Sequence, residues 1–199
     1  MTSPTYRPNI LVTGTPGTGK TTTSELIALA VGFQHIEVGK LVKEKQLHNG
    51  FDEEFQSWLL DEDKVVDELE PIMQEGGKII DHHGCDFFPE RWFDLVVVLR
   101  TDNSVLYPRL KKRNYNTNKI TENIECEIME VVVEEARASY KEEIVKELQS
   151  NSLNDMEDNV DWVESWINEF EASGRQPNIL GVRPNEDDES DDSDGMDEA

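Results

Sequence analysis

Residues 14–21 read Gly-Thr-Pro-Gly-Thr-Gly-Lys-Thr, and this stretch decides the fold. It matches the pattern G-x-x-x-x-G-K-[ST] at every position, with an apolar run over 9–14 before it and a helical pattern over 20–31 after it. A strand, a glycine-rich loop and a helix in this order form a phosphate-binding loop (P-loop), whose backbone N–H groups turn inward around phosphate oxygens. A chance glycine-rich turn seldom has the full pattern in this setting. The stretch therefore predicts a protein that binds a nucleoside triphosphate.

The residues of this loop have separate expected roles. Gly17 and Gly19 leave room for phosphate oxygens close to the backbone, and the helix that starts near Lys20 adds the positive end of its dipole. We expect Lys20 to reach the β- and γ-phosphates of ATP, the Thr21 hydroxyl to hold Mg²⁺, and Thr22 to donate to the α-phosphate. ATP with Mg²⁺ is thus the nucleotide that the sequence predicts.

The rest of the chain alternates between strand and helix patterns. Strands are expected at 9–14, 34–38, 78–81, 95–100 and 144–148, and helices at 20–31, 61–75, 104–113, 121–140 and 158–170. Residues 41–55 have a mixed pattern, for which we expect two short helices. Such alternation indicates βαβ units. The predicted fold is an α/β P-loop NTPase, with a five-stranded parallel sheet and helices on both of its faces.

An acidic residue ends the strand at 78–81, at the place where a P-loop needs a carboxylate near its metal ion. This residue is Asp81, and ligands of such sheets bind at the carboxyl ends of the strands. We therefore expect Asp81 in the Mg²⁺ shell, although a strand-end aspartate can also cap the next turn. His83 follows two residues later and points to the same side of the chain; it could serve the site or be a loop histidine satisfied by backbone. The cluster His82, His83, Cys85 and Asp86 is spaced too tightly for a zinc site.

The chain of 199 residues has a formal net charge of −24, and nine acidic residues lie in 185–199. So acidic a surface disfavours direct, sequence-specific nucleic-acid binding and favours basic protein partners. Neither a secretory signal nor a membrane-spanning run is expected. The two cysteines suggest no disulfide framework. Residues 172–199, rich in Gly, Pro and acids, are predicted to be a disordered tail after a folded region at 1–171.

Several segments resemble the adenylate kinase isoenzyme 6 family, also called coilin-interacting nuclear ATPases. They are the loop at 14–22, DHHGCDFFPERW at 81–92 and VVVLR at 96–100, with further similarity at 61–69 and 138–145. The resemblance covers roughly residues 7–170. It implies an adenylate-kinase-like fold with a short lid at 112–122 and a monophosphate-binding region at 37–60. It also implies the reaction ATP + AMP = 2 ADP, together with ATPase activity.

The resemblance also implies roles for individual residues. Lys20, Asp81, His83 and Arg113 form the expected catalytic set, with His83 near the γ-phosphate and Arg113 as the lid arginine. Arg113 belongs to the cluster Arg-Leu-Lys-Lys-Arg at 109–113, which could alternatively be a solvated basic face or a nuclear localisation signal.

The acceptor site departs from the family pattern. AMP is expected to contact Lys43, which stands where the family has an arginine, and Arg100 or Arg91. Since a lysine lacks the bidentate fork of an arginine, this departure predicts weaker AMP binding.

The same resemblance implies that the protein acts in the nucleus and cytoplasm, takes part in small ribosomal subunit maturation and binds a basic small-subunit ribosomal protein. We expect it to be a monomer. Three functions stay open at this point. The first is an adenylate kinase, and the second is a P-loop kinase with another small acceptor, of the shikimate or gluconate type. The acids of 37–60, without an arginine clamp, count against this second function. The third is a ribosome-assembly ATPase in which AMP turnover is incidental.

Overall fold

The computed structural model describes residues 6–53 and 57–180 and contains a parallel five-stranded sheet. The strand order is β2-β5-β1-β6-β7, in which the first strand of the chain is central. The strands are β1 (Ile10–Thr13), β2 (Gln34–Glu37), β5 (Lys78–Asp81), β6 (Leu95–Arg100) and β7 (Val145–Gln149). Every ladder of this sheet is parallel. The predicted α/β fold with its five parallel strands is confirmed.

One face of the sheet is covered by α1 (Lys20–Val31) and α7 (Leu153–Ala172). Ile10 and Val12 of β1 point to this face, as do Val97 of β6 and Ile27 of α1. All four side chains are fully buried. Because side chains alternate along a strand, the residues between them serve the opposite face.

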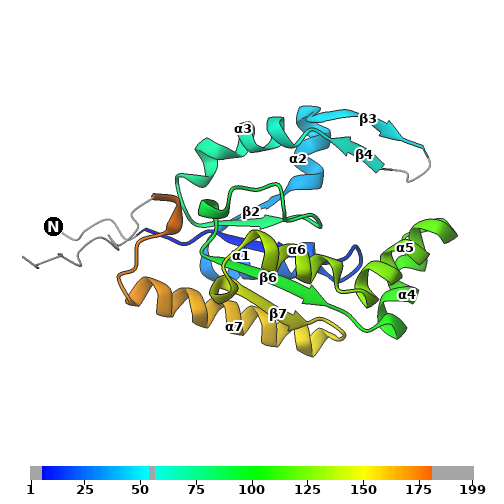
Figure 1. Ribbon diagram of the computed structural model, residues 1–199. Coiled ribbons are helices and arrows are strands. Elements are labelled where there is room, and N and C mark those ends of the chain that lie inside the picture. The colour runs from blue at the N-terminus through cyan, green and yellow to red at the C-terminus, as the bar shows by residue number, and fades with distance from the viewer. Residues whose placement is uncertain (1–5, 54–56, 181–199) are drawn as a thin grey trace, which may run out of the picture.

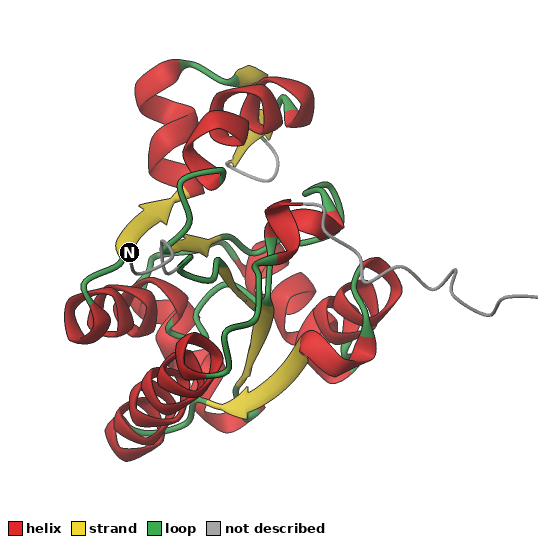
Figure 2. Cartoon of the chain, turned by 90° about the vertical axis from the view of Figure 1, so that its left-hand side faces the viewer, coloured by secondary structure: helices red, strands yellow, loops and turns green. Residues whose placement is uncertain are grey.

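The opposite face is covered by α3 (Glu62–Met73) and α6 (Val131–Ser139). Leu11 of β1 packs in this layer with Leu69 of α3 and Ala136 of α6, and each of these residues is buried. Figure 2 shows helices on both sides of the strands. A strand buried on both faces explains the uninterrupted apolar run in β6.

A β-hairpin follows α2 (Val38–Lys45), and here the prediction of two short helices over 41–55 is wrong. Strands β3 (His48–Asp52) and β4 (Ser57–Leu60) pair antiparallel, and their register shifts between His48 and Phe51. Gly50, with φ of 136°, lies at this irregularity. Gln46 ends α2 in the left-handed region, and the Leu47 N–H bonds the Val42 carbonyl. The chain therefore leaves the helix before the hairpin begins.

The region between β6 and β7 also differs from the prediction, which had a helix over 104–113 and a single helix over 121–140. The structure has α4 (Asn103–Lys112), α5 (Thr117–Ile128) and α6, with a break between the last two. Glu130 takes φ of 56° at this break. Asn116 caps α5 by accepting the Lys119 N–H at 2.8 Å, so this helix starts earlier than predicted. In Figure 1, α4, α5 and the β3–β4 hairpin all lie towards the carboxyl ends of the strands.

The order of the chain extends past the predicted boundary at 171. The Asn178 N–H donates to Asp94 at 2.7 Å, its side chain donates to the Phe93 carbonyl, and Ile179 packs against the core. The acidic run at 185–199 lies outside the described residues. Within the described part of the chain, no helix combines the length and the apolar character that a membrane crossing requires.

Candidate active site

The P-loop joins β1 to α1 and takes a conformation that its glycines allow. Gly14, Gly17 and Gly19 have φ of 142°, 99° and 96°, values that side-chain-bearing residues rarely adopt. A Cβ on Gly17 would lie 2.8 Å from Leu106 Cδ1 of α4, and one on Gly14 would lie 2.6 Å from the Leu99 carbonyl oxygen of β6. The loop is therefore pressed between two neighbouring elements.

Lys20 lies at the start of α1, directly after the loop. Its ammonium donates to the carbonyl oxygens of Gly14 at 2.8 Å and Thr15 at 3.1 Å. Burial lowers the pKa of Lys20 from 10.5 to about 8; nearby Asp81 opposes this shift and Arg113 adds to it. The predicted catalytic groups Asp81 and Arg113 are thus both close enough to Lys20 to affect it electrostatically.

A cleft of about 650 Å³ opens over the loop. The loop residues Gly17, Gly19, Lys20 and Thr21 form its floor, whereas Thr22 is exposed outside this lining. One further part of the wall comes from the chain after β5, and another from the lid and α5. Of the predicted residues outside the loop, Asp81, His83 and Arg113 also line the cleft.

Asp81 ends β5 and is 3% exposed. Burial alone would raise its pKa, but His35, Thr21 and the charge of Lys20 outweigh burial, so the pKa of Asp81 lies below 3.8. His35 Nε2 is 3.6 Å from Asp81 Oδ2, beyond hydrogen-bonding distance, and this oxygen has no hydrogen-bond partner among the described residues. An ionised, buried oxygen beside a threonine hydroxyl is a donor set that suits a hard cation.

His83 lies in the cleft wall beside His82, and the two rings stack with their centroids 4.4 Å apart. Burial lowers the pKa of His83 to about 3 and that of His82 to about 4. His82 is fixed from the backbone, since the Gly84 N–H donates to its Nδ1 at 3.0 Å. Both imidazoles are therefore neutral near pH 7, and His83 can take part in hydrogen bonding but not as a cation.

Arg109 and Arg113 of the basic cluster have different positions. Arg113 follows α4 and lines the cleft, where the sequence prediction puts the lid arginine. Arg109 instead donates to the carbonyls of Ser150 at 2.8 Å and Asn151 at 3.0 Å, and more weakly to that of Gly17. It thereby ties α4 to the loop after β7 and to the P-loop. The sequence places Arg109 on the same helix face as Arg113, among the candidate cations near the lid, but gives it no separate role.

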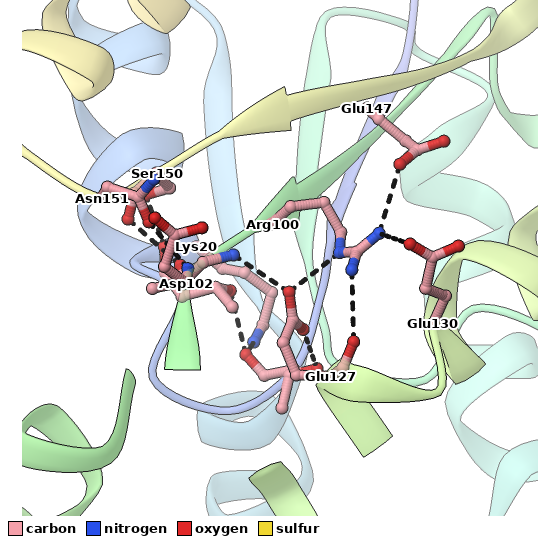
Figure 3. A network of polar contacts seen from close by, with 11 residues as sticks. Lys20, Arg100, Asp102, Glu127, Glu130, Glu147, Ser150 and Asn151 are labelled. Atoms are coloured by element: carbon pink, nitrogen blue, oxygen red, sulfur yellow. Dashed lines mark hydrogen bonds and ion pairs between the residues drawn. The ribbon is translucent and has the colours of Figure 1, made fainter. Parts of the chain in front are cut away.

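The structure does not bring the three predicted AMP contacts into this cleft. Lys43 is exposed on α2, and Arg91 binds the Glu70 carboxylate with two contacts of 2.7 Å. Arg100 is occupied by three carboxylates, those of Glu127, Glu130 and Glu147, as Figure 3 shows. None of these three cations is among the cleft-lining residues in the described chain.

Acidic side chains line much of the remaining cleft: Glu37, Asp86, Glu122 and Glu135. Burial, together with the charge of Asp86, raises the pKa of Glu135.

The α5 face of the cleft was not predicted, although its signal is in the sequence. Lys119, Glu122, Asn123 and Cys126 all line the cleft. Lys119, Asn123 and Cys126 follow one another at spacings of four and three residues, and Glu122 adjoins Asn123, so all four lie on one side of a helix. With the helix start misplaced at Thr121, this face was not recognised.

The comparisons with known proteins agree with this geometry. A family model described as an AAA domain matches residues 10–130. A shikimate kinase from Acinetobacter baumannii, solved in complex with shikimate, has a TM-score of 0.60 at 14% identity, covering 83% of this chain and 96% of that one. At this identity the likeness concerns the fold alone.

Two curated relatives are much more similar in sequence. The adenylate kinase isoenzyme 6 homolog of Dictyostelium discoideum is 58% identical over 161 residues, covering 81% of this chain and 92% of the relative. The homolog of Saccharomyces cerevisiae is 43% identical over 191 residues, covering 94% and 96%. By this similarity along nearly its whole folded length, the chain belongs to the adenylate kinase isoenzyme 6 family of P-loop nucleotide kinases.

Proposed function

We propose that this protein transfers the γ-phosphate of Mg²⁺-bound ATP to AMP, giving two ADP. The observation that carries the proposal is the convergence of Lys20, Asp81 and Arg113 on one cleft above the P-loop. Phosphoryl transfer depends on positioning and charge neutralisation more than on covalent chemistry with the protein, and these groups supply both.

Thr21 and Asp81 are the residues that would hold Mg²⁺. The fit rests on the buried Asp81 Oδ2, which has no hydrogen-bond partner within the described residues, and on the lowered pKa of Asp81, which keeps it ionised. Bound there, the ion would neutralise charge on the β- and γ-phosphates.

The protein's own groups then act on the transferring phosphate. Lys20 and Arg113 carry the positive charge that offsets the charge of the equatorial oxygens. An oxygen of the acceptor phosphate bonds to the γ-phosphorus, the bond to the β,γ-bridging oxygen breaks, and ADP leaves with that electron pair. Neutral His83 orients a reacting oxygen by hydrogen bonding, since its low pKa excludes a cationic role near pH 7.

A second function, ATP hydrolysis, is favoured by the acceptor side of the cleft. Lys43, Arg91 and Arg100 are absent from the lining in the described chain, while carboxylates such as Glu37 and Glu135 are present. An acidic wall repels an anionic acceptor, and water can then take its place. Hydrolysis and kinase activity would use the same Lys20, Asp81 and His83.

We also propose a cellular role in small ribosomal subunit maturation, in the nucleus and cytoplasm, through a basic ribosomal protein. Family membership and the net charge of −24 support this role. Deleting the acidic residues 185–199 is expected to weaken binding of such a protein at low salt. Unchanged affinity at both low and moderate salt would rule out a contribution of the tail.

The enzymatic test measures ADP and inorganic phosphate from ATP-Mg²⁺, with and without AMP. A kinase forms ADP in proportion to AMP consumed and releases little phosphate. Lys20→Ala should reduce turnover by on the order of 10²–10³-fold. Lys146→Ala is the matched control, because Lys146 of β7 lies over the Trp162 ring of α7 and is not among the cleft-lining residues. Phosphate release indifferent to AMP would replace the kinase proposal by the hydrolase.

A further inference from the structure

Glu127, near the end of α5, is a buried carboxylate that joins three parts of the fold. It is 5% exposed. Its Oε1 accepts the Arg100 Nε at 2.8 Å and the Thr101 N–H at 3.0 Å, and its Oε2 accepts the Thr15 hydroxyl at 2.5 Å. Figure 3 shows Glu127 in this network beside Lys20 and Arg100. One side chain thus connects α5, the end of β6 and the P-loop.

Thr15 is the P-loop end of this connection. It is 1% exposed and is not among the cleft-lining residues, so its hydroxyl serves Glu127 behind the loop. On its other side, the Thr15 carbonyl accepts the Thr18 hydroxyl at 2.9 Å and the Lys20 ammonium at 3.1 Å. The bond to Glu127 therefore fixes the residue whose carbonyl orients Lys20.

The other end of the connection is the helix that forms a wall of the cleft. Lys119, Glu122, Asn123 and Cys126 of α5 line the cleft, and Glu127 directly follows the last of them. Arg100 holds Glu127 in turn, and it also contacts the Glu127 carbonyl at 3.2 Å and the more exposed Glu130 and Glu147. Burial opposes the charge of Arg100, but the hydrogen bonds and charges of Glu127 and Glu130 outweigh burial and raise the pKa of this guanidinium. The contacts of Glu127 with Arg100 and Thr101 therefore do not depend on the Thr15 hydroxyl.

We propose that Glu127 is a positioning residue, which holds the P-loop in its nucleotide-binding geometry through the Thr15 hydroxyl. The same contact couples the geometry of the P-loop to the position of α5. The inference rests on the proposed binding of ATP at this loop. Without the tether the loop spends part of its time in other conformations, and apparent affinity falls by the fraction of competent protein. Arg100 accordingly belongs to the support of the phosphate site rather than to the acceptor site.

The cleanest test removes only the tether. Thr15→Val keeps the shape of the side chain and the net charge, and leaves Glu127 with Arg100 and Thr101. We expect the Kd for Mg²⁺-ADP, measured by titration calorimetry, to rise roughly tenfold, the factor that loss of one charge-assisted hydrogen bond can give. Thr15→Ser retains the hydroxyl and should restore wild-type affinity. Glu130 contacts the same guanidinium but not the P-loop, so Glu130→Gln should leave the Kd unchanged.

A mutant cycle then assigns the effect to Glu127. In the Glu127→Gln background the charge of the acceptor is gone, so Thr15→Val should raise the Kd by much less than it does in the wild-type background. Equal fold-changes in the two backgrounds would overturn the proposal. So would a Thr15→Val protein with a lower Tm and unchanged Kd, since that pattern belongs to a purely structural bond. Absence of Mg²⁺-ADP binding by the wild-type protein would instead contradict the proposed function.

Discussion

Gly14 shows at the scale of one residue why the P-loop has its sequence. Its φ of 142° and its distance from the Leu99 carbonyl leave no room for a side chain, because the obstacle is rigid backbone of the central sheet. Gly39 in α2 is the opposite case, since a Cβ there would meet no atom within 4 Å. The two glycines are thus constrained very differently.

Gly14→Ala is therefore expected to lower the free energy of unfolding by about 2–4 kcal/mol, through positive-φ strain and the clash with β6. Gly39→Ala, within a helix, should change it by less than about 1 kcal/mol and towards greater stability. Urea unfolding followed by circular dichroism compares the two variants. Equal effects would contradict the reading of Gly14 as sterically required.

Single residues also mark where sequence reasoning succeeds and where it stops. The motif and the strand end are local signals, and they point to residues that line the cleft: Gly17, Gly19, Lys20, Thr21 and Asp81. Arg113 lines it too, whereas Thr22 does not. Arg100 was placed with AMP, but its partners Glu127, Glu130 and Glu147 come from elements well separated from it in sequence. No local pattern announces which carboxylates a cation will meet after folding.

Among the elements, α5 is defined by its two ends. Asn116 caps its start. After its end, Glu130 takes a left-handed backbone conformation that interrupts the helical path, although this residue is not a glycine. Because no glycine marks the interruption, the helical pattern over 121–140 was predicted as one helix. In the structure, the contact of Glu127 with Arg100 of β6 fixes the end of α5. The hairpin was also missed, although Gly50 within the expected helices was an available signal for an irregular strand.

The cap of α5 can be tested separately from its packing. Asn116→Ala removes the acceptor of the Lys119 N–H and should cost about 1 kcal/mol of local stability. Amide exchange in the first turn of α5 should then be about fivefold faster, as hydrogen-exchange mass spectrometry would report. Asp61→Ala removes the equivalent cap of α3 and is the matched control. If α5 exchanges alike in both variants, the Asn116 cap contributes nothing.

For the whole molecule, Asp94 joins the two ends of the described chain. Its carboxylate accepts the N–H of Asn9, just before β1, and the N–H of Asn178, after α7. Burial raises the pKa of Asp94 from 3.8 to about 6 in spite of these two bonds. The folded protein therefore binds the Asp94 proton more tightly than the unfolded chain does.

This difference predicts a pH dependence. Because the folded-state pKa is the higher one, stability from this group is present at low pH and is lost as pH rises from about 4 to about 6. Asp94→Asn removes the titration. As the pH rises from 4.5 to 7.5, the free energy of unfolding of wild type should fall by roughly 2 kcal/mol more than that of the variant. Urea unfolding at several pH values measures the difference, and a difference independent of pH would refute the assignment.

The place of β1 in the middle of the sheet has a consequence for how the protein is made. β1 leaves the ribosome before both of its neighbours, β5 and β6, and Ile79 of β5 pairs beside Ile10 only after 69 further residues. At roughly 5–20 residues per second, translation of that stretch takes roughly 3–14 s. During this interval the apolar strand that precedes the P-loop has no partner strand. The nascent chain therefore exposes a strand suited to chaperone capture before the nucleotide site can form.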